Sequence, residues 1–401
     1  MSLFLQVVSV SAAIEEIGNL AVRCGTEKVS LVGALHRILA EDVRADGDIP
    51  GFTRSVVDGY AVRAADTTGS SDTIPSIFPL CGRIAMGASA GTRIKPGECI
   101  YVPTGGILPE GADAVVMIEH AEQIGSEILI KKPVAHGENV LFFNEDFSSG
   151  DLICKMGRRL SPQDIGVLAA AGCIDVPVVR IPIIGILSTG NELVPVNIQP
   201  LPGQVRDVNS YVIASFVREQ GCTPVIYGIV PDDRNALRSA LSKATAECDA
   251  VLISGGSSKD DRDMVAAIIR DMGEVLIHGI AIAPGKPTII GRYGNKPVIG
   301  LPGHPASAFI VLVVIIRHLF AGMTGDRKSR VRSVQARLDQ NIPSSRGRED
   351  YVRVILHDGI ATPLFGKSGL LNTLIKSHGI IRIPAESEGL ETGTLVEVMV
   401  W

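Results

Sequence analysis

The sequence contains few aromatic residues and no excess of positive charge. Phe, Trp and Tyr together make up 4% of the 401 residues, and the formal net charge is −5. Proteins that bind nucleic acids usually present a basic surface, and those that bind single strands add aromatic side chains on which bases stack. The sequence therefore indicates neither a nucleic-acid partner nor binding to an anionic membrane surface.

Closely spaced cysteines are absent as well. The chain has seven cysteines, an odd number, and no CxxC pair. This wide spacing argues against a disulfide framework and predicts reduced, mostly buried thiols in a cytosolic protein. The seven are Cys24, Cys81, Cys99, Cys154, Cys173, Cys222 and Cys248.

The sequence also lacks a long hydrophobic segment and a signal peptide. The most apolar run, residues 306–316, is shorter than the roughly 20 residues that cross a bilayer, so we expect a buried helix there. The N-terminus has no basic stretch followed by an apolar core. We therefore expect a cytoplasmic protein without membrane contact.

The N-terminal part of the chain predicts helices on both sides of an all-β insertion. Helical spacing covers residues 12–23, with Ser11 as N-cap and Gly25 as stop, and a second short helix is expected at residues 34–39. Short apolar runs separated by Gly, Pro, Asp and Ser follow, as in small β domains. A clean helix at residues 161–172 is expected to return and pack on the N-terminal helices.

Strands and helices alternate between residues 183 and 325, which predicts a doubly wound, mostly parallel sheet. The tail from residue 331 returns to a β pattern. A chain of this length suits two to four domains. The expected domains are a helical piece (1–45 and 147–177), an inserted β domain (46–146), an α/β domain (178–327) and a C-terminal β domain (328–401). The strands expected in the sheet are residues 183–187, 224–229, 250–253, 275–282 and 297–301.

The most informative stretch lies at residues 249–287, with the sequence DAVLISGGSSKDDRD at its start and GIAIAPGKPT at its end. A buried parallel strand at residues 250–253 leads into Gly255 and Gly256, which allow close approach of a ligand. A second strand at residues 274–283 leads into a stiff PGKP turn that presents Lys286. Carboxylates and a lysine together fit a divalent metal bridging to a phosphate or oxyanion. The alternatives are an ordinary turn, helix-capping aspartates and a solvated lysine.

Loops elsewhere carry similar ambiguity. The pair Asp58-Gly59 is typical of a hairpin turn, and the segment after Val102 has the composition of a simple loop. In GLPGHPAS, Pro305 fits the first helical position, and the free N–H groups of the helix start favour an anion. Five strand-end loops with such side chains at one edge of a sheet favour a ligand site there.

Taken in order, the motifs resemble a known family. They are DGYAV, VPTGGILPEGADAVV, GENVLFFNEDFSSGD, SPQDIGVLAAAG, STGNEL, SGGSSKDDRD, APGKP and GLPGHPAS. Together they are similar to the molybdopterin molybdenumtransferase family, the MoeA type shared with the gephyrin E domain. The resemblance implies a helical piece, an inserted β domain, a molybdopterin-binding α/β domain and a C-terminal β-barrel. It also implies insertion of molybdate or tungstate into adenylylated molybdopterin with release of AMP, as part of molybdenum cofactor biosynthesis.

The resemblance assigns roles to residues of this chain. The catalytic set it implies is Asp58, Thr104, Asp146, Glu192, Asp232 (or Asp233), Asp263 and Lys286. Glu192, Asp232 and Asp263 are the implied ligands of Mg²⁺, which prefers hard oxygen donors. The implied binding residues are Ser188, Thr189, Gly190, Gly255, Gly256, Ser257, Ser258, Pro284, Gly285, Pro302, Gly303, Arg348 and Ser368.

Several positions depart from the family pattern. Ala283 stands where many members have a lysine before PGKP, and Leu141 where a basic residue is common. Lys259 follows the SGGSS loop where a glycine is usual before the aspartates, and His304 replaces the asparagine of GLPGNP. The loss of two positive charges is expected to weaken oxyanion binding, and Lys259 would restore one.

The resemblance further implies a homodimer, with each site formed between the sheet domain of one chain and the β domain of the other. Two alternatives remain, a non-catalytic scaffold of the same fold and a molybdopterin adenylyltransferase, and the second is disfavoured by the flanking domains. A P-loop NTPase is excluded because PGKPT has no upstream GxxxxG.

Overall fold

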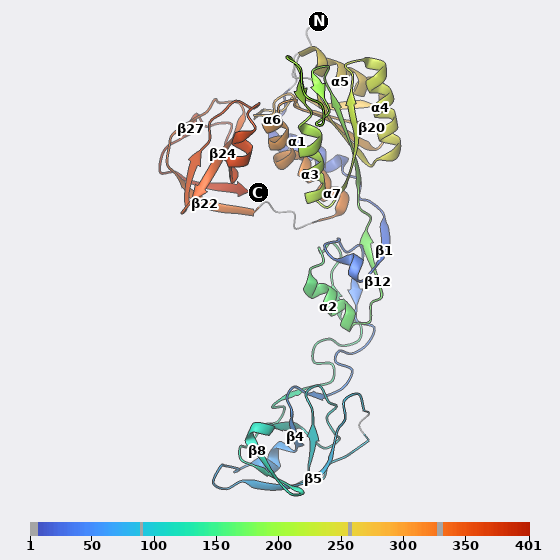
Figure 1. Ribbon diagram of the computed structural model, residues 1–401, viewed down its shortest axis with the longest axis vertical. Helices are drawn as coiled ribbons and strands as arrows, with labels where there is room; N and C mark the ends of the chain where they lie inside the picture. Colours follow the sequence, from blue (N-terminus) through green and yellow to red (C-terminus); the bar gives the residue numbers. More distant parts are fainter. Residues whose placement is uncertain (1–6, 89–90, 256–258, 327–331) are drawn as a thin grey trace.

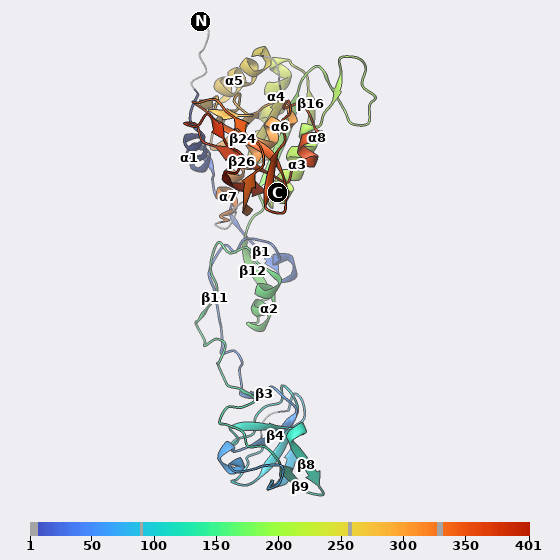
Figure 2. The same ribbon diagram turned by 90° about the vertical axis from the view of Figure 1, so that its left-hand side faces the viewer.

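The protein is described from a computed structural model covering residues 7–88, 91–255, 259–326 and 332–401, with only the backbone described at residues 259–263. The molecule is elongated (Figures 1 and 2). A sheet domain and a barrel lie side by side at one end, a small piece follows, and a β domain occupies the opposite end.

The sheet domain contains a six-stranded mixed sheet in the order β16-β13-β17-β21-β20-β18. Four strands are parallel, as predicted: β13 (Ile183–Thr189), β16 (Thr223–Val230), β17 (Ala250–Gly255) and β21 (Lys296–Leu301). All but the last residue of β17 are buried, which fits the apolar run with neighbours on both sides.

The prediction of one continuous strand at residues 274–283 is wrong, because the segment is interrupted in its middle. It divides into β18 (Glu274–His278) and β19 (Ile282–Ala283), separated by Gly279 at a φ of 110°. β18 pairs with β20 (Ile289–Tyr293), an antiparallel strand that the sequence analysis missed. β19 leaves this sheet and pairs with a strand of the barrel.

Helices cover both faces of the sheet. On one face lie α4 (Arg234–Glu247) and α5 (Lys259–Met272). On the other lie α3 (Asn209–Glu219) and a 20-residue helix made of α6 (Pro305–Val311), a π-helical turn η4 (Leu312–Ile316) and α7 (Arg317–Thr324). This helix is long and apolar enough to cross a membrane, but 72% of it is buried inside the protein. It is therefore the core helix that was predicted, extended at its C-terminal end.

The first helix differs from its prediction in limits and in packing. α1 (Val10–Leu20) begins after Ser9, whose side chain accepts a hydrogen bond from the Ala12 amide, so Ser9 and not Ser11 is the N-cap. α1 packs against α7 and η4 within the core of the sheet domain. It is therefore not part of the small piece below.

The small piece is built on an antiparallel pair, β1 (Thr26–Ser30) with β12 (Asp175–Val179). α2 (Pro162–Ala170) has the predicted Ser161 cap and packs over this pair rather than on α1. The helix predicted at residues 34–39 is wrong, because only a 3₁₀ turn, η1 (Val32–Ala34), forms and His36 takes a φ of 63°. β2 (Val43–Arg44) pairs with β11 (Leu152–Cys154) where the chain leaves and re-enters.

The inserted domain is all-β, as predicted. Its main sheet has the order β7-β4-β6-β5-β9-β8, and a short pair β3–β10 lies beside it. The strands are β3 (Arg54–Ser55), β4 (Gly59–Val62), β5 (Ser76–Arg83), β6 (Cys99–Val102), β7 (Ala114–Met117), β8 (Ala121–Ile124), β9 (Glu127–Ile130) and β10 (Val140–Leu141).

The C-terminal domain is a closed barrel, because β24 pairs with both β25 and β26 in the order β24-β25-β22-β28-β26. Its strands are β22 (Arg332–Leu338), β24 (Glu349–His357), β25 (Ile360–Pro363), β26 (Gly379–Ile383) and β28 (Leu395–Val400). A pair β23 (Ile342–Pro343) with β27 (Gly389–Leu390) and a short helix α8 (Asn372–Lys376) complete it.

All seven cysteines are free thiols and four are buried, as predicted.

Candidate active site

A cavity of about 720 Å³ opens at the carboxyl ends of the parallel strands, where the edge of the sheet meets a loop of the barrel. Its size suits a small organic ligand. Predicted residues form part of its lining: Thr189, Glu192, Gly255 and Gly303. The rest of the lining is Leu193, Pro200, Gln204, Val205, Arg206, Asp207, Val208, Asn209, Ser254, His304, Pro305, Gly369 and Leu371.

Asp232 stabilises the loop after β13 through hydrogen bonds. Its Oδ1 accepts a hydrogen bond from Thr189 Oγ1 at 2.7 Å, and its Oδ2 accepts one from the Asn191 amide at 2.8 Å. Asp233 instead caps α4 by accepting a bond from the Ala236 amide. Of the two candidates, Asp232 therefore lies beside the cavity residues, and Asp233 serves the helix.

Two glycines let this edge of the sheet close tightly. A Cβ on Gly255 would lie 2.0 Å from Thr189 Cγ2, so no larger residue fits beside β13. Gly190 has a φ of 153°, and the Glu192 carboxylate folds back to within 3.0 Å of where its Cβ would lie. Glu192 is exposed, and its side chain makes no hydrogen bond or ion pair with the described residues. Its carboxylate is therefore available to a ligand.

The sequence analysis missed a buried polar cluster below the cavity. Ser188 is fully buried, and its hydroxyl bonds to Asp207 Oδ1 at 3.1 Å and to Ser210 Oγ at 2.8 Å. Asn209 donates from Nδ2 to Ser254 Oγ at 2.7 Å. The signal was the polar pair Asp207 and Asn209 at the start of an apolar helix, where such residues are favoured.

The start of α6 is engaged by the barrel. The Ala306 amide donates to the Ser368 carbonyl at 3.2 Å, and His304 Nδ1 lies 3.0 Å from Ser368 Oγ. His304 precedes the helix in an extended conformation and its side chain does not cap it. One of the N–H groups predicted to hold an anion is thus already bonded, and Ser368 is brought to the edge of the cavity. Pro302 is buried at the end of β21, ahead of this contact.

The PGKP turn is held between the sheet domain and the barrel. β19 pairs with the start of β24, with Ala283 opposite Asp350, and Gly285 is buried at a φ of 130°. Arg348 Nε donates to Asp350 Oδ1 at 2.9 Å. Lys286 is exposed and lines neither the large cavity nor the smaller one beside this turn.

That smaller cavity, of about 330 Å³, contains a buried guanidinium that was not predicted. Arg353 lies beside Pro284 and Ser368 in its lining, and its Nη2 donates to the Gly366 carbonyl at 3.2 Å. Its Nη1 has no partner among the described residues, and burial lowers its pKa. A positive charge is thus placed next to the turn although Ala283 provides none.

The predicted residues of the inserted domain lie elsewhere. Asp58 Oδ1 accepts a hydrogen bond from the Thr104 amide at 2.8 Å, so these two residues are brought together. The hairpin turn predicted at Asp58-Gly59 is wrong, since Gly59 begins β4, which pairs with β6 and β7. Asp146 is exposed on another loop of the same domain. Figures 1 and 2 show this domain at the opposite end of the molecule from the sheet domain.

The predicted metal ligands are only partly described. In the described residues no group of three or more His, Cys, Asp and Glu side chains is arranged to hold a metal ion. The side chain of Asp263 and the residues Gly256, Ser257 and Ser258 lie outside the description, as does the side chain of Lys259. Glu192 and Asp232, on adjacent loops, provide hard oxygen donors that suit Mg²⁺.

Comparison with known proteins covers almost the whole chain. A model described as the MoeA N-terminal region (domain I and II) matches residues 8–172, one described as a probable molybdopterin binding domain matches residues 185–321, and one described as the MoeA C-terminal region (domain IV) matches residues 335–401.

Individual relatives agree with these matches. A Bacillus subtilis protein named molybdopterin molybdenumtransferase is 31% identical over 98% of this chain and 94% of its own length. A Methanocaldococcus jannaschii protein named for molybdopterin biosynthesis is 37% identical over 93% of this chain and 91% of its own. The crystal structure of a molybdopterin biosynthesis MoeA protein from Pyrococcus horikoshii is 36% identical, with a TM-score of 0.86 over 98% of this chain and 99% of that one.

Proposed function

This chain belongs to the MoeA family, and we propose that it is a molybdopterin molybdenumtransferase that inserts molybdate or tungstate into adenylylated molybdopterin and releases AMP. The observation that carries the proposal is the cavity at the carboxyl ends of β13, β17 and β21. In open α/β sheets this edge is where ligands bind. The matches to all three regions of the family, in order, support the same conclusion.

Charge neutralisation is the main task of such a site. The reaction brings an oxyanion to an activated phosphate, and both carry negative charge. Lys286 on the stiff turn, Arg353 beside Pro284 and Arg206 in the cavity lining are cationic groups of the described residues near this edge. A divalent ion, held by Glu192 and Asp232 and by Asp263, would polarise the phosphate oxygens. The free carboxylate of Glu192 fits that role, because it has no partner among the residues described.

The separation of the inserted domain supports a homodimer with shared sites. The inserted domain, which contains Asp58, Thr104 and Asp146, lies at the opposite end of the molecule from the sheet domain, which contains the cavity (Figure 2). Asp58 Oδ2 has no hydrogen-bond partner in the described part of the chain. In a dimer with a two-fold axis, the loops of each copy would reach the cavity of the other copy.

The direct test is AMP release by the full-length protein. Purified protein is given adenylylated molybdopterin with molybdate, with tungstate, or with neither, and with or without a chelator. We expect release that requires an oxyanion and a divalent ion. Tight binding of the substrate with no release under any condition would contradict the transferase and favour the scaffold.

The variant Glu192→Ala tests the site itself. We expect a loss of turnover of about 100-fold or more, as is typical for removal of a group that stabilises transition-state charge, with the fold intact because Glu192 is exposed on a loop. Glu15→Ala, on the exposed side of α1, is the charge-matched control. Unchanged turnover in Glu192→Ala would remove this carboxylate from the mechanism.

Mixed dimers test the shared site. Asp58→Ala and Lys286→Ala are dissociated together and reassembled, so that half of the dimers are mixed and each mixed dimer contains one intact site. Recovered activity should be about a quarter of the wild-type value, by the symmetry of a two-fold dimer. No recovery, with exchange verified by mass, would show that both residues serve the same chain.

A further inference from the structure

Asp207 is a buried carboxylate whose position is fixed by its neighbours. Its side chain is 5% exposed. Its Oδ1 accepts hydrogen bonds from Ser188 Oγ and from the Ser210 amide, both at 3.1 Å, and the two serine hydroxyls lie 2.8 Å apart. The strand β13 and the first turn of α3 therefore hold this carboxylate at the wall of the 720 Å³ cavity.

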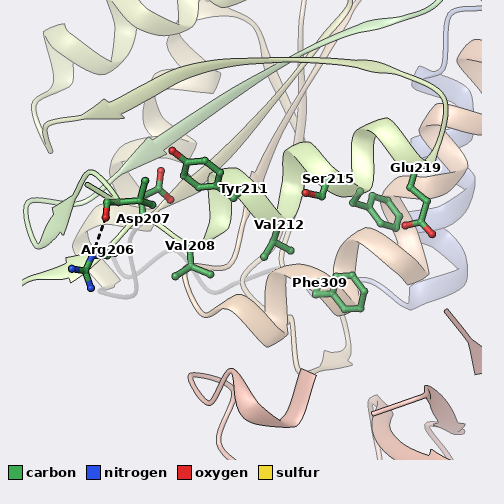
Figure 3. A pocket seen from close by; sticks show the side chains of 10 residues that line it. Arg206, Asp207, Val208, Tyr211, Val212, Ser215, Glu219 and Phe309 are labelled. Atoms are coloured by element: carbon green, nitrogen blue, oxygen red, sulfur yellow. Dashed lines mark hydrogen bonds between the residues drawn. The ribbon is translucent and has the colours of Figure 1, made fainter. Parts of the chain in front are cut away.

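The charge of Asp207 has no cationic partner. Arg206, the next residue, donates from Nε to the Val196 carbonyl at 3.1 Å (Figure 3) and from Nη2 to Gln199 Oε1 at 3.0 Å. No Lys, Arg or His of the described chain forms an ion pair with Asp207, and its Oδ2 accepts no hydrogen bond from those residues. Asp207 Oδ2 is not enclosed by the described residues, so a ligand in the cavity that brings N–H donors can bond to it.

Asn209 holds the same wall in place. Its Nδ2 donates to Ser254 Oγ at 2.7 Å and to the Gly303 carbonyl at 2.8 Å. Because a carbonyl oxygen only accepts, the amide cannot be reversed. Its Oδ1 therefore points the other way, enclosed and without a partner in the part of the chain that is described. This enclosed oxygen is not accessible from the cavity, so Asn209 holds the wall in place and Asp207 offers the free acceptor.

We propose that Asp207, on a wall that Asn209 holds in place, recognises the N–H donors of the substrate's pterin ring. This rests on the proposed function, which makes molybdopterin the occupant of the cavity. A pterin presents a 2-amino group next to a ring N–H, two donors that match a carboxylate. The deaminated counterpart, a lumazine, has a carbonyl oxygen at position 2, which would face the Asp207 carboxylate as acceptor against acceptor. Asp207 therefore selects the amino form of the heterocycle.

The test compares two small heterocycles, 6-hydroxymethylpterin and 6-hydroxymethyllumazine, by titration calorimetry on the full-length protein. The wild type is expected to bind the pterin about 10- to 100-fold more tightly, the range of a hydrogen bond to a charged group. Asp207→Asn keeps an oxygen for Ser188 and the Ser210 amide, but replaces Oδ2 with a donor. This variant should lose the preference or reverse it, and a structural role alone would weaken both ligands equally.

The control is Glu219→Gln, which removes a carboxylate from the far end of the same helix and should leave the preference unchanged. A wild type that shows no preference, or binds neither heterocycle, overturns the inference, as does Asp207→Asn with the wild-type preference. If Asp207→Asn fails to fold, the wild-type comparison alone decides. A preference for the pterin without AMP release would overturn the proposed function and leave this inference standing. AMP release without a preference for the pterin would overturn this inference and leave the proposed function standing.

Discussion

The sheet domain and the inserted β domain both carry predicted site residues on loops, but they hold those loops differently. In the sheet domain, the two carboxylate oxygens of Asp232 accept hydrogen bonds from Thr189 Oγ1 and the Asn191 amide. Ser188 and Asp207 form a buried network beneath them. In the inserted domain, the exposed Asp58 holds one backbone amide, that of Thr104.

In the sheet domain the site residues are held in place within one chain. In the inserted domain they lie on a surface that is available to a second chain. Buried polar groups must be matched inside the fold, so their loss costs stability. Exposed loop residues are matched by water, so their loss is felt mainly in function. Changes to the buried groups of the sheet domain should therefore lower stability and activity together, and changes to exposed residues of the inserted loops should lower activity alone.

The largest effect on the free energy of unfolding is expected from Gly255→Ala. The new Cβ would lie 2.0 Å from Thr189 Cγ2 and 3.0 Å from the Thr189 carbonyl oxygen. Overpacking of this kind costs about 1–3 kcal/mol, and we expect the upper end together with loss of activity. Urea unfolding measures it. Gly166→Ala in α2, where no atom of the described chain lies within 4 Å, should instead gain about 0.5–1 kcal/mol. Equal changes in the free energy of unfolding for Gly255→Ala and Gly166→Ala would contradict the tight packing inferred at Gly255.

Asp249→Asn should follow, and its effect should depend on pH. Burial raises the pKa of Asp249, but hydrogen bonds from Arg180 and from the Ile183 amide, and the charge of Arg180, outweigh it, so the pKa is lowered. A lowered pKa stabilises the fold above the unfolded value of about 3.9, and the stabilisation is lost as the pH falls through the folded value.

The measurement is urea unfolding of Asp249→Asn and wild type at several pH values. Leaving Arg180 without its charged partner should cost about 1–3 kcal/mol near neutral pH, and the difference should shrink in acid. Asp175→Asn, an exposed position on β12, is the control and should show no such trend. A difference that does not change with pH would contradict the assignment.

Asp58→Ala should show the opposite balance. Only the hydrogen bond to the exposed Thr104 amide is lost, so the free energy of unfolding should fall by less than about 1 kcal/mol. AMP release should fall by about 100-fold, within the range of general acid–base or charge-stabilising groups. Asp72→Ala, an exposed carboxylate of the same domain, should change neither. A large loss of stability would show that this loop is held as firmly as the sheet-domain loops.

The smallest change is expected from His304→Asn. The substitution removes the contact of Nδ1 with Ser368 Oγ but introduces a better N-cap ahead of Pro305. The two effects oppose each other, so the midpoint of urea unfolding should move by the equivalent of less than about 1 kcal/mol. Turnover should stay close to the wild-type value. A marked loss of turnover at unchanged stability would show that His304 contacts the substrate.

Local pattern was enough to predict much of the fold. The four parallel strands, α2 with its Ser161 cap and the all-β insertion were predicted from apolar runs, turn residues and capping residues, which act within a few residues of the chain. The errors arose where local pattern was ambiguous. The continuous apolar character of residues 274–283 hid the break at Gly279, and Asp58-Gly59 has hairpin composition but lies at the start of a central strand.

The candidate site shows the same limit. Thr189, Glu192, Gly255 and Gly303 carried visible motifs, whereas Asp207, Asn209 and Arg353 were missed. Asp207 becomes notable only because β13 brings Ser188 beneath it, and Arg353 only because the barrel closes over it. Sequence neighbours gave no sign of either environment.

By itself, the sequence determined the strand and helix alternation, the family motifs and the chemistry of the loops, because side-chain periodicity and turn preference are local properties. The tertiary structure alone decided which loops meet. It joined the ends of β13, β17 and β21 to a barrel loop that follows β21 by nearly 70 residues, and it placed the inserted domain, which contains Asp58, at the opposite end of the molecule from the sheet domain. Strand pairing and domain connection set those distances, and no local pattern encodes them.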